Sequence, residues 1–212
     1  GIKRLSIQWN NQFTLPMNGV EGIKETNYYL DYQGVRFIAL NSNLMIEEQA
    51  KWLESVLKGN PNKWTIATYH HPIFSASRGR DNVELRNLWK PLFDKYNVDL
   101  ALQGHDHTYT RGRVQPYETN VLDGENIKDE TGTVYVVSVS GGKMYRVKSN
   151  WDEYEGDSRA LRDKVGNNKQ LFQIISIDGN KLSYQSYTAT GELFDAFDLM
   201  KNKNGRNSFI ER

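Results

Sequence analysis

All histidines of this 212-residue sequence lie in two short clusters, one with His70 and His71 and one with His105 and His107. The first cluster opens a His-His-Pro segment, and the second is a Gly-His-Asp-His segment. Imidazole nitrogens bind Zn, Fe and Mn, and because the chain has no cysteine, any such ion must be held by histidine and oxygen ligands. A single histidine beside a strand is more often a hydrogen-bonded structural residue. Two clusters that contain all four histidines favour a metal site.

Each cluster follows a short apolar run that is typical of a buried strand. The first run, 64–70, reads Trp-Thr-Ile-Ala-Thr-Tyr-His, and the second, 98–105, reads Val-Asp-Leu-Ala-Leu-Gln-Gly-His. Apolar residues at helical spacing predict one helix at 46–59 and another at 81–96, which Pro91 should kink or interrupt. In an open α/β sheet, ligands bind where the loops after the strand ends converge. We therefore expect the two clusters to face a common crevice.

The rest of the chain adds strands and two long polar stretches. Strand pairs are expected at 28–32 with 35–41 and at 171–178 with 181–189, with a further strand at 133–142 and a shorter one at 193–199. The polar stretches, 113–131 and 146–168, show no periodicity. Loops of such length are usually lids or binding loops, so we expect them to determine substrate choice.

The overall composition limits the classes of protein to which the chain can belong. It has 27 Lys and Arg against 26 Asp and Glu, so its net charge of +1 argues against a general binder of nucleic acid or membrane surfaces. Hydrophobic residues make up 38% of the chain, which predicts a packed core. No apolar run approaches the roughly 18 residues of a transmembrane helix. The length fits one domain or a large part of one.

The two histidine segments resemble the last two signature blocks of the calcineurin-like metallophosphoesterases, most closely those of purple acid phosphatases and their bacterial relatives. The matching segments are 67–72, Ala-Thr-Tyr-His-His-Pro, and 104–107, Gly-His-Asp-His. Flanking segments agree with the family as well, and the resemblance extends from about residue 28 to 145. It implies an α+β fold, namely the C-terminal half of a four-layer α/β/β/α sandwich with mixed sheets.

The resemblance also implies a role for individual residues. His70 and His105 correspond to ligands of one metal ion and His107 to a ligand of the other, which a turn after the strand would allow. His71 stands where purple acid phosphatases often have another residue; it either orients substrate, hydrogen-bonds to a ligand group, or makes an ordinary structural contact. The aspartate between the last two histidines is expected to point away from them. Arg111 could neutralise phosphate, and the alternative for it is an ion pair.

Three further blocks of the family, which supply an Asp, a bridging Asp, and an Asn with a neighbouring His, have no counterpart in this sequence. We therefore expect the chain to be the C-terminal half of a metallophosphoesterase. Residues 1–27 would then form a leading loop, and residues 28–145 a core with both histidine segments. Residues 146–200 would form a long loop followed by antiparallel strands, and residues 201–212 a frayed polar tail.

For the intact protein, the resemblance implies hydrolysis of phosphate monoesters by two divalent or trivalent ions, Fe, Zn or Mn. The chain alone should hold at most one ion, weakly, because two adjacent cations need carboxylates and a bridging anion. Two alternatives remain open at this point. The chain could be a non-catalytic half-domain or binding module with residual metal affinity, or a mononuclear zinc hydrolase that uses His70, His105 and His107.

The expected partners follow from the same reasoning. One expected partner is a phosphate ester substrate. The other is either the missing N-terminal half or a second copy of the chain, because a layered domain that lacks half its residues leaves apolar surface uncovered. No nucleic acid or membrane partner is expected. Relatives of this type are usually secreted or periplasmic, which implies a location outside the cytoplasm.

Overall fold

A computed structural model describes residues 8–114, 130–147 and 160–212. The helices are α1 (Trp9–Gln12), α2 (Ile46–Lys58), α3 (Val83–Leu88) and α4 (Lys90–Lys95). The strands are β1 (Tyr28–Tyr32), β2 (Val35–Ala39), β3 (Trp64–Thr68), β4 (Leu100–Gln103), β5 (Tyr109–Val114), β6 (Glu130–Thr131), β7 (Val134–Val137), β8 (Ala160–Gly166), β9 (Leu171–Asp178), β10 (Lys181–Thr188), β11 (Leu193–Lys201) and β12 (Asn207–Glu211). None of the helices in these ranges has the length and apolar character needed to span a bilayer.

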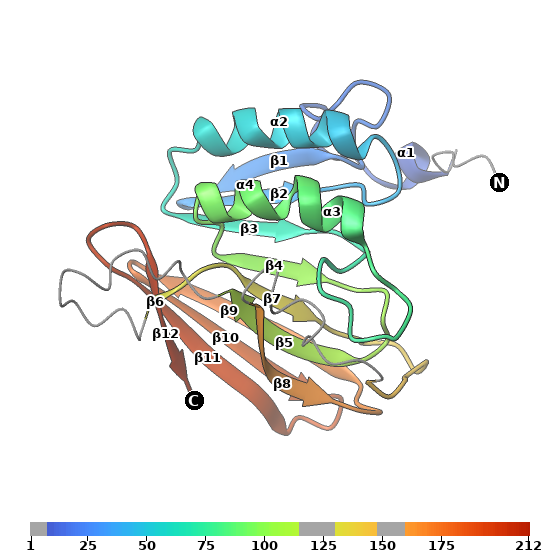
Figure 1. Ribbon diagram of the computed structural model, residues 1–212, viewed down its shortest axis with the longest axis vertical. Coiled ribbons are helices and arrows are strands. Elements are labelled where there is room, and N and C mark those ends of the chain that lie inside the picture. Colours follow the sequence, from blue (N-terminus) through green and yellow to red (C-terminus); the bar gives the residue numbers. More distant parts are fainter. Residues whose placement is uncertain (1–7, 115–129, 148–159) are drawn as a thin grey trace.

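The strands form two sheets, one mixed and one antiparallel. The first has seven strands in the order β1-β2-β3-β4-β7-β5-β8, and the second has five in the order β6-β12-β11-β10-β9. In the first sheet, β2, β3, β4 and β7 run parallel, while β1, β5 and β8 pair antiparallel with their neighbours. Helices α2, α3 and α4 lie along strands β1 to β4 (Figure 1), and the second sheet packs against the opposite face of the first. This arrangement confirms the predicted α+β class with mixed sheets.

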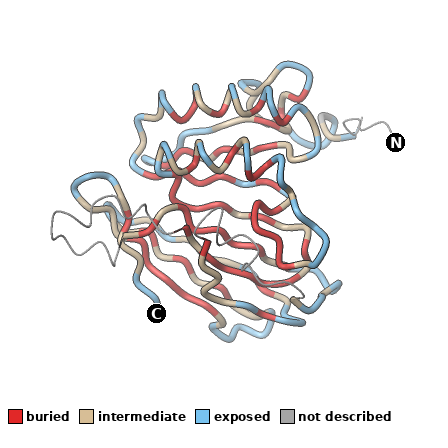
Figure 2. The backbone as a smooth tube through the Cα atoms, viewed as in Figure 1, coloured by how far each residue is buried: buried red, intermediate tan, exposed pale blue. Residues whose placement is uncertain are grey.

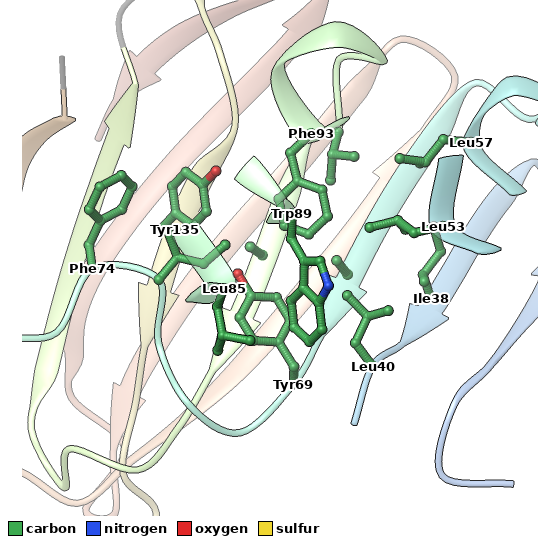
Figure 3. Close-up of a cluster of buried hydrophobic side chains, with 14 of the residues drawn as sticks. Ile38, Leu40, Leu53, Leu57, Tyr69, Phe74, Leu85, Trp89, Phe93 and Tyr135 are labelled. Atoms are coloured by element: carbon green, nitrogen blue, oxygen red, sulfur yellow. The ribbon is translucent and has the colours of Figure 1, made fainter. Parts of the chain in front are cut away.

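The parallel strands are buried on both faces, which explains their continuous apolar sequences. In β7, Tyr135 packs toward the helices, whereas Val134 and Val136 pack toward the second sheet. Figure 2 shows the resulting band of buried backbone through the centre of the molecule. Figure 3 shows the cluster under the helices, where Trp89 of the α3–α4 junction lies beside Leu85 and Tyr69. The rings of Trp89 and Tyr69 meet edge to face at 5.5 Å, which ties the end of β3 to the helical layer.

The helix expected at 81–96 is two helices, α3 and α4. Pro91 lies in the first turn of α4, where its missing N–H has no helical partner to lose, so it begins the second helix instead of continuing the first. The hairpin expected at 28–41 is confirmed. Its turn residues Gln33 and Gly34 have φ angles of 47° and 80°, the left-handed conformation that a two-residue turn between antiparallel strands requires.

Two expectations for the C-terminal part are wrong. Residues 201–212 are not a frayed tail, because β12 pairs with β11 and β6 and the side chain of Asn207 is buried against the carboxylate of Asp99 at 2.7 Å. The polar stretch 146–168 is not all loop, because it contains β8, an edge strand that pairs with β5. Residues 115–129 and 148–159, in the middle of the two predicted binding loops, lie outside the described residues.

The outer face of the second sheet carries apolar side chains. Phe172 and Ile174 of β9 are both 45% exposed, and they alternate with Ile175, which faces the first sheet. Figure 1 places all the helices of the described residues away from this face. The described chain therefore has three layers, in the order helices, mixed sheet and antiparallel sheet.

Candidate metal centre

The two histidine clusters follow β3 and β4, which are neighbouring parallel strands of the first sheet. Hydrogen bonds between the two segments continue beyond the strands themselves. The Tyr69 N–H donates to the Leu102 carbonyl at 3.1 Å, and the Gly104 N–H donates to the His70 carbonyl at 3.0 Å. This continued pairing places the first histidine cluster directly beside the second.

The side chains of His70 and His105 meet at this strand edge. His70 Nε2 lies 3.0 Å from His105 Nδ1, although the residues are 35 positions apart in the chain. Two nitrogens on one tetrahedral zinc lie roughly 3.3 Å apart, so this spacing suits two ligands of the same ion. Together with His71 they form a group whose ligand atoms all lie within 4.8 Å of one another. No other group of this kind is found in the ranges that the structure describes.

The surroundings of these two imidazoles favour their neutral form. Burial lowers the pKa of His70 below its ordinary value, and the nearby His107 lowers it further. Burial also lowers the pKa of His105, with an additional contribution from the positive charge of Arg80. Because a metal ion binds the neutral imidazole, both residues are in the ligand form near neutral pH.

His107 lies on the same turn but is held by a different partner. The backbone of this turn is left-handed at His105 and His107, with φ angles of 71° and 51°, a conformation that costs free energy for a side chain other than glycine. His107 Nδ1 lies 2.6 Å from the Lys143 carbonyl, and its ring stacks on Tyr145 at 5.2 Å. An imidazole that donates its Nδ1–H to a carbonyl carries a lone pair on Nε2, as metal-binding histidines commonly do.

His107 does not belong to the group of three ligand atoms formed by His70, His71 and His105. The structure therefore does not bring together the set that a mononuclear site of His70, His105 and His107 requires. It is compatible instead with His107 as the ligand of a different ion.

Two buried side chains of the second segment fix the loop that follows the first. Gln103 Oε1 accepts a hydrogen bond from the Ile73 N–H at 2.7 Å. Asp106 Oδ2 accepts hydrogen bonds from the Ser75 hydroxyl at 2.8 Å and the Ala76 N–H at 2.7 Å. The fully buried Asp106 thus points away from the histidines, as the sequence predicted, and it fastens one loop to the other.

The expectation that Arg111 neutralises phosphate is wrong, because its guanidinium is paired with carboxylates. Its side chain is fully buried between the sheets, where Nε lies 2.7 Å from Asp195 Oδ2 and Nη2 lies 2.9 Å from Glu211 Oε1. A third carboxylate, of Asp163, lies 3.3 Å from Nη1. The alternative role, an ion pair, is the one that the structure shows.

A different arginine, Arg80, lies at the cluster. Its Nη1 donates to the His105 carbonyl at 3.2 Å and lies 3.7 Å from Asp106 Oδ1, and its side chain is 40% exposed. No local sequence pattern indicates this position, because Arg80 lies in an irregular segment between β3 and α3. A partly exposed guanidinium beside the histidines is able to bind an anion there.

His71 lies between the cluster and an open pocket. Its ring centroid is 4.8 Å from that of His70 and 4.4 Å from that of His105, while Nδ1 lies 2.9 Å from the hydroxyl of Ser42. Ser42 and His71 both line a pocket of about 740 Å³ that extends to the first turns of α2 and α3. Ser42 was not among the expected site residues. Its only signal in the sequence is its position just after the apolar run of β2.

Known proteins match this chain over much of its length. The family model for calcineurin-like phosphoesterases matches residues 2–109. The Fe(3+)-Zn(2+) purple acid phosphatase 12 of Arabidopsis thaliana is 34% identical over 102 residues, which cover 44% of this chain and 22% of that enzyme. Purple acid phosphatase 4 of the same plant is 29% identical over 149 residues, covering 70% of this chain and 38% of the relative.

Among solved structures, purple acid phosphatase PPD1 from seeds of yellow lupin (Lupinus luteus) superimposes with a TM-score of 0.65 at 20% identity. The superposition covers 91% of this chain and 35% of the lupin protein. At that identity the likeness shows a shared fold. The chain thus spans well under half of the length of these relatives.

Proposed function

The chain belongs to the calcineurin-like phosphoesterase family, and on this premise we propose that it supplies the histidine side of a two-metal centre that hydrolyses phosphate monoesters. The observation that carries the proposal is the 3.0 Å approach of His70 Nε2 to His105 Nδ1 across two parallel strands. This pair would hold one ion, and His107 would bind the other through Nε2. The intact protein would be a metal-dependent phosphoesterase that acts outside the cytoplasm, and its similarity to purple acid phosphatases supports this location.

The donor set of the described residues fits part of such a centre. Two ions about 3.5–4 Å apart require carboxylates and a bridging anion to offset their repulsion. The carboxylate of Asp106, which stands between His105 and His107 in the chain, is turned toward Ser75 and Ala76. In the described portion of the chain, the only clustered metal ligands are imidazoles, which bring no negative charge. We therefore assign the acidic ligands to a segment of the whole protein beyond these residues, and expect the chain alone to bind at most one ion, weakly.

When bound, the metal pair would supply a hydroxide nucleophile and stabilise charge on the phosphoryl oxygens. The side chains of this chain would orient the substrate relative to the metal pair. Arg80, partly exposed beside His105, would donate hydrogen bonds to a phosphoryl oxygen. The pocket lined by Ser42 and His71 would receive the alcohol group of the ester, because it opens directly beside the cluster.

Metal analysis and an activity assay distinguish the proposal from its alternatives. The purified chain, incubated with Zn, Fe or Mn, should retain one ion or fewer and should not hydrolyse p-nitrophenyl phosphate. The longer protein that contains it should retain two ions and turn over, and His105→Ala should abolish this activity. Turnover by the 212-residue chain alone, lost in His105→Ala, would instead establish a mononuclear enzyme. An inactive full-length protein with bound metal would establish a non-catalytic module.

A further inference from the structure

The hydroxyl of Ser42 contacts His71 through two different atoms of that residue. The backbone N–H of His71 donates to Ser42 Oγ at 3.0 Å, and Ser42 Oγ also lies 2.9 Å from His71 Nδ1. Ser42 belongs to the segment between β2 and α2, whereas His71 follows β3, so the two contacts join neighbouring strand ends. A side chain held at both its backbone and its ring has little freedom to rotate.

The single hydroxyl proton decides the direction of the second contact. A serine hydroxyl has one proton and two lone pairs, and the His71 N–H occupies one lone pair. If the hydroxyl donates to Nδ1, both groups are satisfied within this pair. The reverse direction would have Oγ accept twice and would leave its proton without a partner among the described residues. The network therefore favours a neutral His71 that accepts at Nδ1 and carries its proton on Nε2.

His107 shows the opposite arrangement. Its Nδ1 faces the carbonyl of Lys143 at 2.6 Å, and a carbonyl is able only to accept. His107 must therefore donate from Nδ1, which leaves the lone pair on Nε2 for a metal ion. His71 belongs to the three-histidine group and His107 does not. The hydroxyl at Nδ1 of His71 and the carbonyl at Nδ1 of His107 give the two residues opposite capacities at Nε2.

We propose that Ser42 is a positioning residue that keeps the proton of His71 on Nε2, so that His71 donates a hydrogen bond to a phosphoryl oxygen at the cluster and does not ligate the metal. The proposal rests on the function proposed above and assigns a specific role within it. It also separates His71 from the other members of the three-histidine group, since a ring nitrogen that carries a proton cannot bind a metal ion. Binding of the phosphoryl group would thereby be shared between Arg80 and His71.

Nitrogen NMR of the chain labelled at its four histidines tests the proton position directly. At a pH of about 8, where the imidazoles are neutral, the long-range proton–nitrogen spectrum should show His71 with an unprotonated Nδ1. His71→Gln identifies its signals by their loss. Addition of Zn should shift the signals of His70 and His105 and leave His71 with its proton on Nε2. A His71 protonated at Nδ1, or one that binds Zn with the other two, would overturn the proposal.

Two Ser42 variants provide the matched comparison. Ser42→Ala removes the donor and should make the two ring tautomers of His71 comparably populated, whereas Ser42→Thr keeps a hydroxyl and should preserve the wild-type spectrum. In the Zn-loaded chain, affinity for inorganic phosphate should fall roughly tenfold in His71→Ala, the usual consequence of losing a hydrogen bond to a charged group. It should fall less in Ser42→Ala and be retained in Ser42→Thr. Unchanged phosphate affinity in His71→Ala would overturn the assigned contact.

The NMR spectra test the ring proton of His71 and the enzyme assay tests the proposed function, so either result can be negative without the other. If His71 carries its proton on Nε2 but the full-length protein hydrolyses no phosphate ester, the proposed function is wrong and the ring assignment stands. If the full-length protein is active while Zn binds His71, the function stands and the positioning role of Ser42 is wrong.

Discussion

His70 and His105 lie on separate strands, yet their ring nitrogens approach to 3.0 Å because the β3–β4 pairing continues through the hydrogen bond from Gly104 to the His70 carbonyl. The candidate site is thus a consequence of strand register. A shift of one residue between these strands would turn one of the imidazoles to the opposite face of the sheet.

The first prediction concerns the affinity of the chain for a single ion. His70→Ala and His105→Ala should each weaken Zn binding by roughly 100-fold or more, since the loss of even an outer hydrogen-bond partner of a ligand costs 10–100-fold. His107→Ala should have a much smaller effect on this first ion, because His107 lies outside the group of three. Calorimetric titration of the three variants measures the difference. Equal losses in all three would indicate a single ion shared by those histidines.

The second prediction separates the two arginines. Arg111→Met should destabilise the fold by about 3–5 kcal/mol, because it leaves the buried carboxylate of Asp195 without its positively charged partner. Arg80→Met should change stability little, since its side chain is 40% exposed, but should weaken phosphate binding to the Zn-loaded chain. Denaturant unfolding and phosphate titration of both variants provide the comparison. A stable Arg111→Met variant with weakened phosphate binding would instead indicate that Arg111 binds phosphate.

The third prediction concerns pH and the ion pair of Asp31 with Arg36. The hydrogen bonds from Arg36, at 2.7 and 2.8 Å, lower the pKa of Asp31 below its ordinary value. A carboxyl whose folded pKa is lowered stabilises the fold above its unfolded pKa, about 3.9, and loses this contribution as the pH falls through the folded pKa.

Asp31→Asn should therefore be less stable than the wild type at pH 7, by about 1 kcal/mol or less for a partly exposed pair. The difference should disappear in acid, below the folded pKa. Urea unfolding at several pH values measures it, with Asp178→Asn, at the exposed end of β9, as the control. A difference that persists unchanged to pH 2 would show that the pair does not titrate as described.

The fourth prediction concerns the edge of the second sheet. We propose that the outer face of β9 is where the chain self-associates or binds the rest of the protein, because β9 is an edge strand and its Phe172 and Ile174 are each 45% exposed. Phe172→Lys with Ile174→Lys should reduce self-association of the purified chain in sedimentation, whereas Ser176→Lys, further along the same exposed face, should reduce it less. A monomeric wild-type chain would contradict the proposal for self-association.

The elements that carry the site were predictable because their signals are local. The apolar runs before His70 and His105 and the helical stripe of α2 depend only on the residues within each segment. Strand β8 was missed because an edge strand lacks the continuous apolar sequence that burial on both faces produces. The terminal strand β12 was missed because it is short and polar, and it is a strand only through its pairing with β11 and β6.

The side chains around the histidines were harder to predict for a related reason. Arg111 and Arg80 have the same chemistry, and only the pairing of β5 with its neighbours and the packing of the second sheet show that one is buried and the other is not. Ser42 could not be found from spacing, since its role depends on the distance between the ends of β2 and β3. Tertiary contacts of this kind have no local sequence pattern.

Asp106, fully buried and bonded to Ser75 and Ala76, holds its two flanking histidines on a turn with a left-handed backbone through contacts within the polypeptide itself. The entropy of ordering this loop is therefore lost when the polypeptide folds and not when an ion arrives. A rigid binding site of this kind would select among cations by their preferred coordination geometry more strongly than a flexible site would. It does not change shape to suit an ion that prefers another arrangement of ligands.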